Sequence, residues 1–129
     1  MRTQRQPLRR LYAELNRRFF DGHLPTYRVR RAPFADPWMD AFRRGSGGRR
    51  LRQPRRRWAD RLGDCDSAAQ CIRVSDSLSA DEERRVLLHE MCHAATPGDD
   101  HGPRWCQMMR RLAEQGETWA AEEADEYEA

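Results

Sequence analysis

Three residues in the second half of the chain have types and a spacing that suit metal-dependent chemistry. The sequence reads HEMCH from His89 to His93, so the two histidines are four positions apart. On a helix this separation places both imidazoles on one face, where their nitrogens can reach a single Zn²⁺ at about 2.0–2.1 Å. Glu90 would project beside the metal and take a proton from a water molecule that the metal acidifies. The motif therefore predicts a zinc site with Glu90 as the general base.

A catalytic zinc usually has three protein ligands and keeps its fourth position for water, so this site needs a third ligand. His101 follows His93 after a Pro97–Gly98 turn, which can redirect the chain towards the metal. Glu114, further along, is the alternative, because it would give a His₂Glu site. We favour His101, since the helix start at Pro103 would fix its position, whereas Glu114 lies near an acidic and weakly packed end.

The helix that carries the two histidines has a clear predicted start. Ser79 and Glu82 have the spacing of a capping box, and acidic residues in the first turn favour the positive end of the helix dipole. A second helix is predicted from Pro103, with an apolar stripe that we interpret as core packing. That stripe comprises Trp105, Met108, Met109 and Leu112.

The remaining elements are predicted from shorter patterns. Residues Pro7–Phe20 repeat apolar side chains at helical spacing, and Gly22 follows as a stop. Thr26–Arg31 and Gln70–Ser75 alternate apolar and polar residues, which indicates two strands, whereas Gly63–Gln70 is rich in turn-forming residues.

Charge is unevenly distributed along the 129 residues. Residues 1–62 contain 18 Arg against 5 acidic residues, whereas residues 63–129 contain 6 Arg against 16 acidic residues. Segment 43–57 alone contains eight Arg, with three Gly and one Pro, which predicts an irregular loop. Such a segment attracts nucleic-acid phosphates without reading sequence, and Trp58 after it could stack on an unpaired base. DNA, single-stranded or in nucleoprotein, is therefore a candidate partner, and a merely solvated loop is the alternative.

Length and composition set the other expectations. One domain is predicted over residues 1–119, and the acidic residues 120–129 are predicted to form a disordered tail. No apolar run is long enough to cross a membrane and no secretion signal is evident, so we expect a cytoplasmic protein. Four cysteines without a CxxC pair favour reduced thiols, with a Cys65–Cys71 bridge as the alternative. The oligomeric state stays open.

The segments HEMCHA and HGPRW together resemble the SprT-like zinc metalloproteases, the group that includes the Spartan proteases of DNA–protein crosslinks. The likeness extends back through IRVS to LYAELNRRFFDGHLP and covers most of residues 8–113. It implies that His89, His93 and His101 are zinc ligands and that Glu90 is the catalytic base. It also implies a minimal zincin-like α+β fold, in which a small antiparallel sheet packs on the HExxH helix and two further helices.

Together these patterns predict a zinc-dependent endopeptidase that acts on a protein substrate, with DNA-associated proteins as candidates. An extended substrate could add to the sheet edge near Gln70–Ser75. Two alternatives stay open: a nucleic-acid-binding module whose zinc is only structural, and a metal-dependent regulator that cleaves a single repressor.

Overall fold

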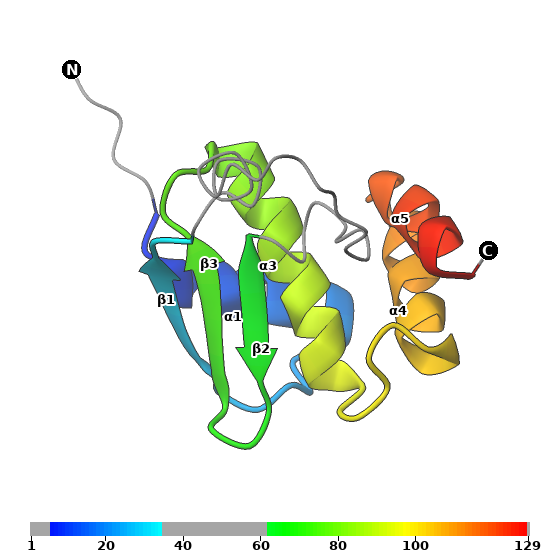
Figure 1. The fold of residues 1–129 in the computed structure, drawn as a ribbon, viewed down its shortest axis with the longest axis horizontal. Coiled ribbons are helices and arrows are strands. Elements are labelled where there is room, and N and C mark those ends of the chain that lie inside the picture. The colour runs from blue at the N-terminus through cyan, green and yellow to red at the C-terminus, as the bar shows by residue number, and fades with distance from the viewer. Residues whose placement is uncertain (1–5, 35–61, 129) are drawn as a thin grey trace, which may run out of the picture.

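The computed structural model describes residues 6–34 and 62–128 of the chain, and these residues form an α+β fold in which helices lie on one side of a small sheet (Figure 1). The Arg-rich segment 43–57 and Trp58 lie outside the described residues. The elements, in chain order, are α1 (Leu8–Phe20), β1 (Arg28–Ala32), β2 (Gly63–Asp66), β3 (Cys71–Ser75), α3 (Ala80–Ala95), α4 (Pro103–Glu114) and α5 (Trp119–Glu128).

The three strands form one mixed sheet with the order β1-β3-β2. β2 and β3 pair antiparallel, because only the short turn at residues 67–70 joins them. β1 pairs with β3 in parallel, so the predicted all-antiparallel sheet is wrong for this pair. A long stretch of chain separates β1 from β3, and it leaves room for the crossover connection that parallel neighbours need.

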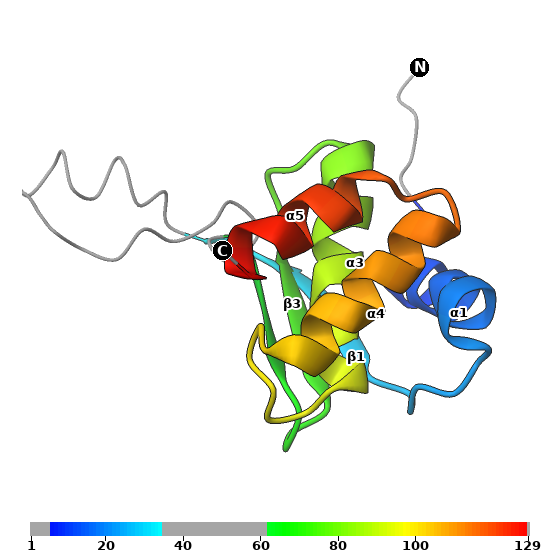
Figure 2. The same cartoon turned by 90° about the vertical axis from the view of Figure 1, so that its right-hand side faces the viewer.

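Helices α1 and α3 cover the same face of the sheet, as the edge-on view shows (Figure 2). Ile72 and Val74 of β3 point towards them and are fully buried, because alternate residues of a strand face the same side. From α3, the apolar residues Val86, Leu87, Leu88 and Met91 are also fully buried. The helix that carries the HExxH motif therefore runs through the centre of the core.

A partly buried ion pair joins β1 to α3. Arg31 donates hydrogen bonds from Nε and Nη2 to the carboxylate of Glu83, at 2.6 and 3.0 Å. The Glu83 side chain is only 4% exposed, so this carboxylate is held away from water by a charged partner. The pair holds the first turn of α3, just after the cap at Ser79, next to the sheet.

Helices α4 and α5 pack against each other and lie beside α3, on the β2 side of the sheet (Figure 1). The predicted disordered tail at residues 120–129 is wrong up to Glu128, because α5 is a helix and its Ala120 and Ala124 are fully buried. Small side chains at these positions let α5 approach α4 closely. Among the described residues, the helices are all too short or too polar for a membrane crossing.

Candidate metal centre

His89 and His93 are placed by α3, whose start is fixed as the sequence predicts. The Ser79 hydroxyl accepts a hydrogen bond from the Glu82 amide, and the Glu82 carboxylate accepts one from the Ser79 amide. This reciprocal capping satisfies two amides that have no partner within the helix. Because the helix is regular from its cap to Ala95, the two imidazoles lie one turn apart on one face.

His101 reaches the same place from the loop between α3 and α4. Asp100 and His101 both have positive φ angles, 42° and 68°, an uncommon conformation for residues other than glycine. The loop is held by Asp99, whose Oδ2 accepts a hydrogen bond from the Trp105 amide in the first turn of α4 at 2.8 Å. Gly102 is needed beside it, since a Cβ there would be 2.9 Å from the Asp99 carbonyl oxygen. The loop therefore has a strained backbone at the position where the strain turns His101 towards the other two histidines.

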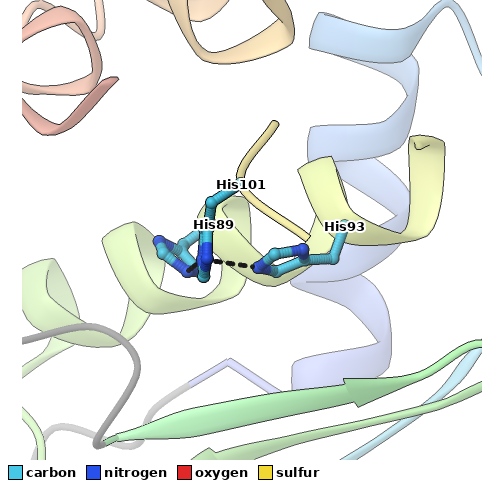
Figure 3. A group of neighbouring side chains, drawn as sticks. All are labelled: His89, His93 and His101. Atoms are coloured by element: carbon cyan, nitrogen blue, oxygen red, sulfur yellow. Dashed lines mark hydrogen bonds between the residues drawn. The ribbon is translucent and has the colours of Figure 1, made fainter. Parts of the chain in front are cut away.

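The Nε2 atoms of the three histidines converge on one point (Figure 3). Nε2 of His101 lies 3.0 Å from Nε2 of His93 and 3.4 Å from Nε2 of His89. Ligands at about 2.0–2.1 Å in a tetrahedral zinc site are about 3.3–3.4 Å apart, which matches the distance between His101 and His89 and is slightly longer than that between His101 and His93. Among the described residues, these three form the group that could hold a metal ion.

Trp105 of α4 forms the base of this cluster. Its ring is fully buried and lies edge-on to His89 and His101, with ring centroids 5.0 and 4.6 Å apart. It lies nearly parallel to His93 at 5.5 Å, and its Nε1 donates to the carbonyl oxygen of His89 at 3.5 Å. The predicted role of Trp105 in core packing is therefore incomplete, because the ring also limits how the three imidazoles can turn.

Glu90 lines a cleft of about 590 Å³ that opens over His93 and His101. The residue is only 2% exposed, and a Cβ placed on Gly63 of β2 would be 3.3 Å from its Oε2. Cys65 of β2 lines the same cleft. Its burial is the main cause that raises the pKa of the Cys65 thiol to about 12, and the nearby charge of Glu90 is the next. The cleft is lined by residues of β2 and its turn, of α3 and of the loop after it: Gly63, Asp64, Cys65, Ser67, Glu90, His93, Thr96, Gly98, Asp100 and His101.

Glu114, the fourth histidine and the cysteines lie outside the histidine group. Glu114, the alternative third ligand, is exposed at the end of α4 and is not part of the histidine group. His23 is exposed after α1 and lines a different cavity.

The cysteines are free, so the alternative of a Cys65–Cys71 bridge is wrong. Asp66, not Cys65, is the partner of Cys71 in the β2–β3 register, so the two thiols belong to opposite faces of the sheet.

Two residues at the cluster were missed from the sequence, and both come from α5. The Glu123 carboxylate forms a hydrogen bond with Nδ1 of His89, and the Tyr127 ring stacks on His101 with centroids 4.1 Å apart. A signal was present, because Ala120, Glu123, Ala124 and Tyr127 follow the i, i+3, i+4, i+7 spacing of one helix face. The high acidic content of the segment favoured the prediction of a disordered tail over this helical pattern.

Comparison with known proteins gives one match. The model of the SprT-like family matches residues 8–125, which span nearly the whole chain and include α5 up to Asp125. No curated protein matches this chain. No solved structure matches it either.

Proposed function

Because this chain belongs to the SprT-like family, we propose that it is a zinc-dependent endopeptidase whose substrates are proteins associated with DNA. In this proposal His89, His93 and His101 hold Zn²⁺ and Glu90 is the general base. The single observation that carries it is the convergence of three Nε2 atoms beside a cleft that Glu90 also lines.

The residues around the cleft have the roles that hydrolysis of a peptide bond needs. When bound, zinc would polarise the scissile carbonyl and lower the pKa of water to about 7. Glu90 would accept the proton from the attacking water and deliver it to the leaving amine. Its near-complete burial against β2 restricts the carboxylate to the cleft side of α3. Trp105 would keep the imidazoles oriented while the substrate binds.

The strand that would hold an extended substrate differs from the predicted one. β3, which contains most of Gln70–Ser75, is the central strand and is paired on both sides. Within the part of the chain that the structure describes, β2 is an edge strand, and Gly63, Asp64 and Cys65 of β2 line the cleft. We therefore propose that a substrate adds to β2 through main-chain hydrogen bonds and crosses the cleft beside Glu90.

The alternative of a nucleic-acid-binding module with a structural zinc is disfavoured by the ligand set. Structural zinc sites are closed by four protein ligands, whereas catalytic sites have three and an open position. The group found among the described residues has three histidines and borders a cleft. DNA contact is a separate part of the proposal, and it depends on the basic half of the chain and on residues 43–57.

Glu90→Gln tests the proposed role of Glu90 directly. We expect this variant to bind one zinc per chain like the wild type and to lose cleavage of casein by about 10²–10⁴-fold, because only the proton acceptor is removed. Glu122→Gln, on the exposed side of α5, is the matched control and should cleave normally. Equal cleavage by Glu90→Gln and the wild type would contradict the protease proposal.

The affinity for single-stranded DNA, measured at a series of salt concentrations, tests the DNA part. We expect DNA to bind the wild type and Glu90→Gln equally, and the affinity to fall steeply as salt is raised, because phosphate contacts release counterions. An affinity that does not change with salt would contradict contact through the arginine-rich segment.

Cleavage that is confined to one physiological protein, with none of casein, would favour the single-repressor alternative.

A further inference from the structure

We propose that Glu123 of α5 is a positioning residue of the metal centre, which fixes the ring of His89 so that Nε2 faces the metal. The inference rests on the proposed zinc site and adds a residue outside the HExxH motif and the loop histidine. Glu123 lies 34 positions after His89 in the sequence, and α5 brings the two side chains into contact.

The contact involves the ring nitrogen that the cluster leaves available. Nδ1 of His89 forms its hydrogen bond with Oε1 of Glu123, whereas Nε2 of the same ring faces His101 at 3.4 Å. We infer that Nδ1 donates to the Glu123 oxygen, which places the ring proton on Nδ1. Nε2 then has its lone pair exposed towards the other two imidazoles, which is the form that a metal requires.

Burial makes this contact strong and selective. The His89 side chain is fully buried and that of Glu123 is 13% exposed, so little water competes for either group. Trp105 lies against the ring of His89, with centroids 5.0 Å apart, and blocks rotation on that side. Glu123 and Trp105 therefore both restrict the orientation of the His89 ring.

The helix that carries Glu123 is held by its own packing. Ala120 and Ala124 flank Glu123 on the same face of α5 and are fully buried. Tyr127, one turn after Glu123, stacks on His101 with ring planes 12° apart. The C-terminal helix therefore touches two of the three histidines, and its docking and the geometry of the metal centre depend on each other.

Outer partners of metal-bound histidines typically change metal affinity or activity by about 10–100-fold. We expect Glu123→Ala to weaken zinc binding by about 10–100-fold, because the His89 ring loses its orientation and its charged partner. Glu123→Gln should bind zinc with an intermediate affinity, since the amide oxygen can still accept from Nδ1 but has no charge. Glu122→Ala, one position away on the exposed side of α5, should bind zinc like the wild type.

Zinc dissociation constants from competition with a chromogenic chelator give this comparison without any measurement of cleavage. Thermal melting of the metal-free proteins separates a folding defect from a binding defect, and Glu123→Gln provides a variant close in shape to the wild type. In ¹⁵N NMR spectra of the zinc-loaded wild type, His89 should have a protonated Nδ1, and the signal should shift in both Glu123 variants.

The outcomes distinguish the two proposals. A wild type that binds no zinc would overturn the proposed function. A wild type that binds zinc tightly, with Glu123→Ala and Glu123→Gln of the same affinity and unshifted His89 signals, would overturn the role of Glu123 and leave the zinc site standing. A loss of stability in the metal-free Glu123 variants with unchanged zinc affinity would show that Glu123 serves only the packing of α5.

Discussion

Gly63 at the start of β2 is in direct contact range of Glu90 on α3. A Cβ atom at position 63 would lie 3.3 Å from Oε2 of Glu90 and 2.7 Å from Cγ1 of Val86. It would also lie 3.0 Å from the carbonyl oxygen of Arg73 on the neighbouring strand. The absence of a side chain at Gly63 is therefore what allows the edge strand to approach the helix at the level of the proposed base.

Gly63→Ala should damage both the fold and the proposed site. We expect the free energy of unfolding to fall by about 1–3 kcal/mol, because the added methyl group overpacks a tight contact. We also expect cleavage to fall while zinc is retained, since Glu90 must move and the histidines need not. Urea denaturation, metal content and casein cleavage measure the three effects.

Gly22→Ala is the control for this variant. Gly22 has a φ of +73°, and a Cβ at this position would have nothing within 4 Å, so alanine there is strained without touching the site. It should lower stability and leave the cleavage rate of the folded protein unchanged. If both variants lost cleavage in proportion to their loss of stability, the contact between Gly63 and Glu90 would have no special role.

His101→Ala tests the assignment of the third ligand. We expect zinc affinity to fall by more than the roughly 10–100-fold that the loss of an outer partner costs, because a direct ligand is removed. His23→Ala is the control, since His23 is exposed and lies away from the cluster. Chelator competition measures both. Normal zinc binding by His101→Ala, together with weak binding by Glu114→Ala, would move the third ligand to Glu114.

The sequence predicts the part of the site that depends on local rules. A spacing of four residues places His89 and His93 on one helix face, and the capping box at Ser79 fixes where that helix begins. The turn that brings His101 to the other two imidazoles is also anticipated by Pro97–Gly98. Each of these features is set by contacts within a few residues along the chain.

The features that the sequence does not predict depend on contacts between distant segments. β2 has the sequence GDCD. Because glycine and aspartate are disfavoured in strands, the local sequence does not predict that this segment pairs with β3. The parallel pairing of β1 with β3 joins two segments that are far apart in the sequence. Segment 120–128 looks like an acidic tail, yet the buried Ala120 and Ala124 make it a packed helix.

Ala124→Leu tests whether α5 must dock closely for the metal centre to form. Ala124 is fully buried, and a larger side chain should cost about 1–3 kcal/mol of stability through overpacking. Because α5 would be displaced, Glu123 should lose its contact with His89 and zinc affinity should fall as well. Ala121→Leu, at a partly exposed position of the same helix, is the control. Normal zinc affinity in a destabilised Ala124→Leu protein would mean that the two are independent.

Glu117, between α4 and α5, should make stability depend on pH. Burial alone would raise the pKa of Glu117, but hydrogen bonds from Arg84 and Trp119, at 2.7 and 2.9 Å, outweigh it and lower the pKa below 4.5. Since the folded state binds the proton more weakly than the unfolded state, the ionised carboxylate stabilises the fold above pH 4.5. This contribution is lost as the pH falls through the lowered pKa.

We therefore expect Glu117→Gln to be less stable than the wild type at pH 7 and to approach the wild type as the pH falls well below 4.5. Urea denaturation at a series of pH values measures the difference in the free energy of unfolding. Arg84→Met should show the same pH dependence, and the double variant should add little to either single change, because both remove one ion pair. The difference in the free energy of unfolding between Glu117→Gln and the wild type could instead stay constant down to acidic pH. That result would mean that the ion pair between Arg84 and Glu117 does not stabilise the fold.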